Sequence, residues 1–455
     1  MSDAVWEEAR ETPVAADCDV CVIGGSCTGV FAAVAAARLG AKVAIIERNG
    51  FFGGAATAGL VNHWHSLYDL AGERQIIAGL TQEVVDRLLR RGAVVVNQAA
   101  KPAPGGYLVL NTEQLKLELD ALVREAEVQP FLYALCVAAL KDGDGVRAAV
   151  IEDKTGRRAI KARCFIDASG DGDLIARARL PFRTPDDPQP PTMCAWFVGL
   201  DALDLANPDF RLETDLFDLL TAEELPRGFL WHSQVPGIPG LRMLAGTRVS
   251  GADCADADQL TRAEMEGRRQ LGAIGDLLKR LPGGGETALV RLADQLGVRE
   301  TRHVECGHQL TGEELLGGQR FPDAIANGTY CVDIHHSNRP GTTFRFLDGR
   351  ERYVVPGEPA VESRWRPETG PLPALWQIPY RSLVVRNAGN VLVAGRLVDA
   401  DRTAYGAIRV MVSCNQTGQA AAIAAFLALK AGTSVADVDP ASLRDELRRQ
   451  GAIVI

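Results

Sequence analysis

The sequence lacks several features that mark common classes of protein. It has no excess of basic residues, since its formal charge is −9 at pH 7, and this argues against a general nucleic-acid binder. The N-terminal residues show no basic start followed by an apolar segment, so no secretory signal is predicted and a cytoplasmic location is expected. The 46 glycines follow no Gly-X-Y period, which excludes collagen.

The 455 residues are too many for a single ordinary hydrophobic core, so more than one domain is expected. The amino-acid composition also changes along the chain. A proline-rich stretch over 181–191 and further prolines near 367–373 mark two crossings between domains. We predict a flexible leader over 1–16 and one α/β domain that is split between 17–180 and 380–455. Residues 181–379 are predicted to form an inserted α+β domain.

Local signals predict where several helices begin. Thr81 is a plausible cap for a helix over 81–91. Two capping boxes, Thr261-Arg262-Ala263-Glu264 and Thr311-Gly312-Glu313-Glu314, predict two helices in the inserted domain.

The strongest motif is a glycine-rich loop between a predicted strand and a predicted helix. An apolar run over 19–23 precedes Gly24-Gly25-Ser26-Cys27-Thr28-Gly29, and an alanine-rich helix over 28–39 follows. Glycines allow a tight turn, and the helix N-terminus offers free N–H groups to a pyrophosphate. The next predicted strand ends at Glu47, which is placed to bind ribose hydroxyls. The pattern predicts dinucleotide binding, with Ser26 in place of the usual middle glycine. Residues 20–37 carry no charge, but this loop interrupts them, so no membrane span is predicted.

Further motifs follow in a fixed order along the chain. They are Gly53-Gly54-Ala55-Ala56-Thr57-Ala58-Gly59-Leu60-Val61, Cys164-Phe165-Ile166-Asp167-Ala168-Ser169-Gly170-Asp171-Gly172-Asp173, Gly297-Val298-Arg299-Glu300-Thr301-Arg302, Ile378-Pro379-Tyr380-Arg381, Asn390-Val391-Leu392-Val393-Ala394-Gly395-Arg396, and Arg409-Val410-Met411 with Gly418-Gln419-Ala420-Ala421. With them, the sequence from Asp17 onward resembles the FAD-dependent oxidoreductases of the glutathione-reductase-like superfamily, which has two dinucleotide-binding folds. Within it, the sequence is similar to the bacterial group with a Gly-Gly-x-Ala-Thr-x-Gly-Leu-Val segment. The resemblance implies a Rossmann-like FAD-binding domain, split in sequence, with an inserted α+β substrate domain.

The resemblance also implies a role for particular residues toward FAD. The glycine loop would contact the pyrophosphate, Glu47 the adenosine ribose, and the main chain of Val137 the adenine. Arg396 would approach the ribityl chain, and Met411 would begin the helix that points at the isoalloxazine. The complete predicted set is Ile23, Gly24, Gly25, Ser26, Cys27, Thr28, Gly29, Glu47, Arg48, Gly53, Gly54, Ala55, Ala56, Thr57, Val137, Ala168, Ser169, Gly170, Asp171, Gly395, Arg396, Arg409, Val410 and Met411.

Three histidines are candidates for catalysis. His63 and His65 follow the second glycine segment, and His335 lies in the inserted domain. A histidine at the flavin can act as a general base or hold a substrate oxygen. A structural role stays open for all three, and no metal site is predicted. In the family that the sequence resembles, the signature Gly297–Arg302 usually continues with a second arginine and then a glycine. This chain has His303 and Cys306 at those two positions. If this loop approaches the substrate, a substrate different from the usual one is expected.

These observations predict an FAD-dependent dehydrogenase or oxidase that transfers a hydride from a C–H bond of a small alcohol or amine to flavin N5. Two alternatives stay open: a flavin reductase fed by NAD(P)H, and a dinucleotide-binding protein with a non-redox or RNA-modification role. The glycine cluster at 283–285 follows a predicted helix and not a strand, so a second nucleotide fingerprint is not predicted. The expected partner is a small-molecule substrate, without nucleic acid or membrane, and a homo-oligomer is compatible with the sequence.

Overall fold

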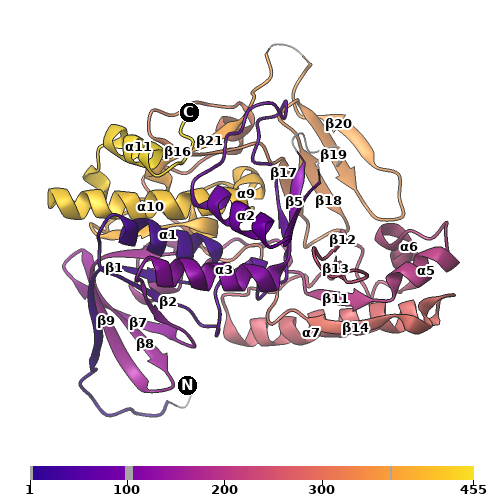
Figure 1. Ribbon diagram of the computed structural model, residues 1–455, viewed down its shortest axis with the longest axis horizontal. Coiled ribbons are helices and arrows are strands. Elements are labelled where there is room, and N and C mark those ends of the chain that lie inside the picture. The colour runs from indigo at the N-terminus through magenta and orange to yellow at the C-terminus, as the bar shows by residue number, and fades with distance from the viewer. Residues whose placement is uncertain (1–3, 98–105, 369–370) are drawn as a thin grey trace.

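A seven-stranded sheet joins the two ends of the chain in the computed structural model, which describes residues 4–97, 106–368 and 371–455 (Figure 1). Its order is β6-β2-β1-β9-β8-β7, and β22 also pairs with β9. The strands are β1 (Val14–Ile23), β2 (Val43–Ile46), β6 (Gln129–Phe131), β7 (Leu135–Asp142), β8 (Gly145–Asp153), β9 (Gly156–Asp167) and β22 (Val391–Val393). Pairing is parallel among β6, β2, β1, β9 and β22, and antiparallel for β7 and β8.

The first strand corrects the predicted leader. β1 begins at Val14 rather than at 19, because its N-terminal half pairs with β9 from Ala159 onward. In the second half of β1, Val20 and Val22 belong to one core cluster while Cys21 and Ile23 belong to another. Both faces of this sheet are therefore covered, as a parallel sheet requires.

Helices pack over the face that Val20 and Val22 occupy (Figure 1). They include α1 (Cys27–Arg38), α2 (Leu80–Arg90), α3 (Thr112–Glu125) and α10 (Met411–Ala431), and α11 (Pro440–Arg449) packs against α10. The contact of α1 with α10 brings the start of α10 to the glycine loop. In the part of the chain that the structure describes, we find no helix with the length and apolarity needed to cross a membrane.

The segment between β9 and β22 forms two further four-stranded antiparallel sheets, of which the first has a core cluster of its own, while Val332 and Ile334 of the second belong to the cluster of Val20 and Val22. In the first, β12 (Trp231–Gln234), β13 (Arg242–Ala245), β11 (Cys194–Val198) and β14 (Ala288–Leu292) pack near α7 (Ala257–Arg280). The second contains β17 (Val332–His335), β18 (Thr342–Arg345), β19 (Arg350–Val354) and β20 (Val361–Arg364).

Smaller elements connect these layers. The strands β3 (His63–Trp64), β5 (Tyr107–Leu110) and β4 (Val94–Asn97) form one sheet, and β10 (Phe182–Arg183) pairs with β15 (His303–Val304). A further pair joins β16 (Ala324–Gly328) to β21 (Trp376–Pro379). The remaining helices are α4 (Asp173–Arg177), α5 (Leu200–Ala206), α6 (Leu212–Leu219), α8 (Gly312–Leu316) and α9 (Arg402–Ile408).

Only one of the three predicted helix caps is confirmed. Thr311 caps α8, because its hydroxyl accepts the N–H of Glu314 while the Glu314 carboxylate accepts the N–H of Thr311. Thr81 is wrong as a cap: α2 begins one residue earlier, after Gly79. Thr261 is also wrong, because α7 starts at Ala257 after an Asp256 cap and Thr261 lies inside the helix.

Candidate active site

The glycine loop is held by close backbone approaches. Gly24 has φ +96°, and a Cβ there would lie 2.6 Å from the carbonyl oxygen of Ala168. A Cβ on Gly29 would lie 1.8 Å from the Gly24 carbonyl oxygen. Ser26, the departure from the fingerprint, caps α1, since its Oγ accepts the Gly29 N–H at 3.3 Å. The serine therefore fits the loop and fixes the start of the helix.

Glu47 lies at the end of β2 and is bound to the glycine loop. Its Oε2 accepts the Gly25 N–H at 2.6 Å, and its Oε1 accepts the main-chain and side-chain N–H groups of Asn49, both at 2.8 Å. Burial raises the pKa of Glu47, with these hydrogen bonds and Arg48 acting in the opposite direction. Glu47 therefore lies beside the glycine loop, where the dinucleotide-binding motif places the acidic residue that binds the ribose.

A narrow channel of about 110 Å³ lies between the glycine loop (24–29), the second glycine segment (53–61) and the start of α10. Most of the predicted cofactor residues line it: Gly24, Ser26, Cys27, Thr28, Glu47, Arg48, Gly53, Gly54, Ala55, Ala168, Ser169, Gly170, Gly395, Arg396, Arg409 and Met411. It is also lined by Asn49, Gln295, Leu296, Val298, Cys414 and Asn415. The thiol of Cys27 is buried, and burial raises its pKa to about 12, so it is not an activated nucleophile.

Other predicted residues lie behind the channel wall. Asp171 is buried, and its Oδ1 accepts hydrogen bonds from Arg396 at 3.0 Å and Thr301 at 3.1 Å. Ile23, Gly25, Gly29, Ala56 and Thr57 surround the loops without lining the channel, and Val410 lines the larger cavity described below.

Val137 is the predicted residue that the structure places elsewhere. It lies in β7, at the opposite end of the sheet order from β6, and it does not line the channel. The main chain after β6 borders Glu47 instead, because the Ala134 N–H donates to the Glu47 carbonyl at 3.0 Å and the Tyr133 N–H to that of Asn49 at 3.1 Å. The strand after α3 is split, and its first half, not its second, borders Glu47.

Polar atoms without a hydrogen-bond partner among the described residues line the channel. Asn415 is only 1% exposed and lines the channel, yet its Nδ2 and Oδ1 both lack a hydrogen-bond partner among the described residues. The same is true of Nη1 of Arg396. Because buried polar groups are nearly always paired, these atoms mark places for ligand atoms. The sequence reasoning missed Asn415, although a polar residue early in an alanine-rich helix was an available signal.

Comparison with known families decides the class of protein. The family model described as FAD dependent oxidoreductase matches residues 19–447. The chain belongs to the family of FAD-dependent oxidoreductases. It is an enzyme with FAD as its cofactor, and its fold is the predicted one, a Rossmann-like FAD-binding domain plus a substrate domain. Within this family, the narrower glutathione-reductase-like assignment stays a prediction.

Solved structures of similar fold are distant in sequence. A geranylgeranyl bacteriochlorophyll reductase-like protein from Thermoplasma acidophilum is 12% identical with a TM-score of 0.46, over 95% of this chain and 83% of that one. The p-nitrophenol 4-monooxygenase from Pseudomonas putida DLL-E4 is 13% identical with a TM-score of 0.43, over 96% and 85% of the two chains. The search of curated proteins finds no match.

In this FAD-dependent oxidoreductase, a larger cavity of about 930 Å³ adjoins the channel. Five residues line both spaces: Ala55, Val298, Arg396, Arg409 and Met411. The start of α10 therefore separates the channel from the cavity, and no side chain caps this helix end. The three histidines predicted as catalytic candidates, His63, His65 and His335, all line the cavity.

The three histidines differ in how their rings are held. His63 packs between Tyr107 and Trp231, with ring centroids 4.4 and 4.1 Å away, and burial lowers its pKa to about 3. His335 Nε2 lies 3.2 Å from Asp333 Oδ1, and its Nδ1 lies 3.3 Å from the Thr342 hydroxyl. Burial lowers the pKa of His335 to about 4, so its imidazole is neutral near pH 7.

His65, like His63, makes no hydrogen bond with another described residue, whereas His335 has polar partners at both ring nitrogens. The ring of His65 packs on Tyr330 with centroids 4.0 Å apart. Burial lowers its pKa to about 4, with the charge of Asp333 partly opposing this effect. A neutral imidazole with available ring nitrogens can accept a proton.

A buried ionic cluster lies beside these histidines, and sequence reasoning missed it. Asp333 Oδ2 accepts hydrogen bonds from Arg409 Nη2 and from the Tyr330 hydroxyl, each at 3.0 Å. Burial alone would raise the pKa of Asp333, but His335 and Arg409 together hold it well below its usual range. The carboxylate is therefore ionised. The alternation Asp333-Ile334-His335 in a strand, with both polar side chains on one face, was a signal for it.

The two departures from the family signature do not face the cavity. His303 is buried, its Nε2 lies 2.8 Å from Glu300 Oε1, and its ring packs on Tyr405. Cys306 is fully buried, and its N–H donates to Asp399 Oδ2 at 2.9 Å. Neither residue lines the cavity, so neither sets its contact surface.

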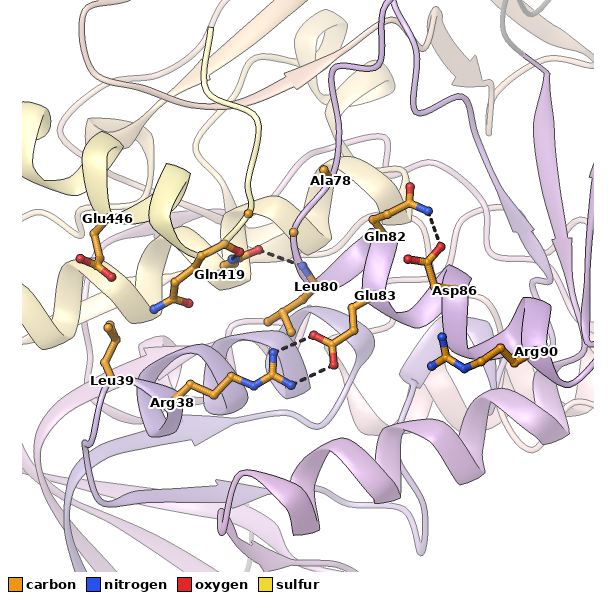
Figure 2. Close-up of a pocket in the computed structure, with 13 residues that line it drawn as sticks. Arg38, Leu39, Ala78, Leu80, Gln82, Glu83, Asp86, Arg90, Gln419 and Glu446 are labelled. Carbon is orange, nitrogen blue, oxygen red and sulfur yellow. Dashed lines mark hydrogen bonds and ion pairs between the residues drawn. The ribbon is translucent and has the colours of Figure 1, made fainter.

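A second hollow lies at the far end of α1 from the glycine loop. Figure 2 shows this groove of about 580 Å³, in which Arg38 pairs with Glu83 at 2.7 Å and Gln82 donates to Asp86 at 2.8 Å. Arg38 and Glu83 pair with each other across it, and it shares no residue with the channel or the cavity. We leave it outside the candidate site.

Proposed function

We propose that this enzyme oxidises a small organic molecule by removing a hydride from a C–H bond next to an oxygen or nitrogen. The observation that carries this proposal is the meeting of the large cavity with the channel at Arg396, Arg409 and Met411. A substrate in the cavity would there face a ligand extended along the channel. A cavity of about 930 Å³ is within the range of sites that enclose small molecules.

FAD would extend through the channel. We assign the pyrophosphate to the glycine loop, the adenosine ribose to Glu47, and the adenine side to the main chain of 133–134 in place of Val137. The ribityl chain would pass Gly395 and Arg396. Bound FAD supplies the redox chemistry by accepting the hydride at N5. The uncapped N-terminus of α10 favours negative charge beside it.

His65 is our candidate for the general base. Its imidazole is neutral, and its nitrogens are free of hydrogen bonds with the described residues, so it can take the proton of a substrate hydroxyl or amine. His335 is less suited to this role, because Asp333 and Thr342 engage both of its nitrogens. We assign to His335 and Asp333 the positioning of substrate.

We further propose the division of labour between the parts of the chain. Residues 17–180 and 380–455 would hold FAD. Residues 181–379 supply many of the cavity residues, among them Cys194, Trp231, Asp333 and Phe344. His63, His65 and Tyr107, which belong to residues 17–180, line the same cavity.

The test is anaerobic reduction of the purified, FAD-loaded protein. Small alcohols, amines and acids are screened for loss of the visible flavin absorbance. With the substrate found, His65→Gln should slow bleaching about 10²- to 10⁴-fold, while His308→Gln, a histidine outside the cavity, should not.

Two outcomes would contradict the proposed reaction, and a third would contradict only the role of His65. Rapid bleaching by NAD(P)H would favour the reductase alternative. A protein that takes up no FAD would favour a non-redox role. An unchanged bleaching rate in His65→Gln would remove His65 as the base and leave the reaction class intact.

A further inference from the structure

The charges that line the large cavity are not all paired. Five arginines line it, and four have a carboxylate partner: Arg396 with Asp171 at 3.0 Å, Arg409 with Asp333 at 3.0 Å, Arg350 with Asp348 at 2.7 Å, and Arg352 with Glu362 at 3.0 Å. Arg299 is the exception, with no carboxylate within 4.0 Å in the described chain. Arg299 is half-buried, and charges withdrawn from water are usually paired, so this one calls for a partner.

The geometry of Arg299 leaves one side of its guanidinium available. Its Nη1 donates to the Pro190 carbonyl at 2.5 Å and to the Thr192 hydroxyl at 2.7 Å. Nη2 and Nε form no hydrogen bond with a described residue, and both atoms keep some solvent-accessible surface. Arg299 lines the cavity but not the channel. Arg299 therefore belongs to the wall of the substrate space and not to that of the channel.

The charge of Arg299 persists at neutral pH. Burial and the nearby charge of Arg409 lower its pKa to about 10, which still leaves it protonated. Asp333 is committed to Arg409, Tyr330 and His335. Among the described residues, Arg299 is thus the arginine of the cavity wall that has no carboxylate partner within 4.0 Å.

Aromatic side chains form another part of the cavity wall. Phe229 lies edge-on to Phe344 with ring centroids 5.7 Å apart, and edge-on to His335 at 6.4 Å. His335 thereby links these rings to the ionic cluster around Asp333. Trp231 and Tyr107 add aromatic surface on either side of His63. In the described part of the chain, the cavity thus combines an apolar wall with one arginine that has no carboxylate partner.

We propose that the substrate is a small carboxylate with an aromatic or apolar body, and that Arg299 binds its carboxylate. The planar Nε and Nη2 edge of arginine matches the two oxygens of a carboxylate. A dianionic phosphate is a poorer match, because one free cation would face two negative charges beside the ionised Asp333. The proposal rests on the proposed function and specifies its substrate class.

Binding of benzoate to the FAD-loaded protein tests this inference without turnover. Affinity is measured by equilibrium dialysis of benzoate and of benzamide, its neutral counterpart. We expect benzoate to bind about 10- to 100-fold more tightly than benzamide, because its carboxylate would form a charge-assisted pair with arginine in a partly desolvated site. Phenylphosphonate should bind more weakly than benzoate. Equal affinities for benzoate and benzamide in the unmodified protein would overturn the proposal.

Variants locate the effect at Arg299. Arg299→Met should weaken benzoate binding about 10- to 100-fold and change benzamide binding less than about threefold. Arg299→Lys keeps the charge and should retain part of the preference, which covers the case in which the methionine variant does not fold. Arg262→Met removes the same charge from an exposed position of α7 and should change neither affinity.

The outcomes separate this inference from the proposed function. A protein that is bleached by a neutral alcohol or amine but shows no preference for benzoate refutes the carboxylate assignment only. If Arg299→Met alters the flavin absorbance spectrum and leaves benzoate affinity unchanged, Arg299 acts on the flavin and the assignment is also refuted. Failure to bind FAD removes the proposed function itself.

Discussion

Asn415 provides the most direct test of the channel as an FAD site. Its side chain is 1% exposed, and both polar atoms of its amide lack a partner among the described residues. An unsatisfied buried polar group costs about 1–3 kcal/mol. We therefore expect Asn415→Leu to stabilise the apoprotein by about 1 kcal/mol, because it removes two unpaired groups at similar volume.

The same substitution should have the opposite effect on the FAD complex. If FAD atoms pair with the amide, their loss costs about 1–2 kcal/mol in the bound state. The changes in the two states combine to about 2–3 kcal/mol, which lowers FAD affinity roughly 30- to 150-fold at about 1.4 kcal/mol per tenfold. Urea unfolding of the apoprotein and titration with FAD, followed by tryptophan fluorescence, give the two quantities separately.

Asn327 offers a matched control. It is equally buried, but its Nδ2 donates to the carbonyls of Ile76 at 3.1 Å and Ile453 at 2.9 Å, and its Oδ1 accepts from Gln377 at 3.2 Å. Asn327→Leu should therefore destabilise the apoprotein and the complex alike by about 1–3 kcal/mol, with FAD affinity unchanged. If Asn415→Leu destabilises the apoprotein in the same way and binds FAD normally, the reasoning about its unpaired amide is refuted.

Three further predictions concern the loop, the acid and the pH dependence. Gly29→Ala should lower the melting temperature and abolish stable FAD retention, because the new Cβ would lie 1.8 Å from the Gly24 carbonyl oxygen; calorimetry and the visible spectrum measure both. Glu47→Ala should weaken FAD binding at least about tenfold in a fluorescence titration, since a charge-assisted ribose contact contributes about 1.5–3 kcal/mol. His335 has a folded pKa lowered to about 4, so the unfolded chain takes up its proton first as pH falls from about 6.5. This gap corresponds to about 3 kcal/mol of stability lost between pH 6.5 and 4, of which about 2 kcal/mol is lost by pH 5. His335→Gln should remove that loss of about 2 kcal/mol between urea melts at pH 7 and 5.

Each of these has a result that would count against it. A Gly29→Ala protein that holds FAD with an unchanged melting temperature would mean that the loop can open without cost. Unchanged FAD affinity in Glu47→Ala would refute the assigned ribose contact. If His335→Gln leaves the pH dependence of the free energy of unfolding unchanged, His335 is not the group responsible for the loss of stability at low pH.

Local features of the site could be predicted from the sequence because adjacent residues carry them. The loop from Gly24 to Gly29 depends on backbone approaches within a few residues, and its strand and helix follow in the chain. The capping box at Thr311 was predictable for the same reason. At Thr261 the local signal misled, because Asp256 caps the helix one turn earlier.

The sequence by itself determined the cofactor class, since a strand, a glycine loop and a helix in that order can be recognised without knowing what packs on them. Only the tertiary structure decided the substrate space. The start of α10 meets the glycine loop from the far end of the chain, and Asp333 meets Arg409 across 76 residues. Arg299 is left without a carboxylate partner among the described residues. Val137 was displaced for the same kind of reason, because sheet order and not chain order sets which strand borders Glu47. Pairing of buried charges and long-range strand order depend on contacts between distant segments, and no local pattern encodes them.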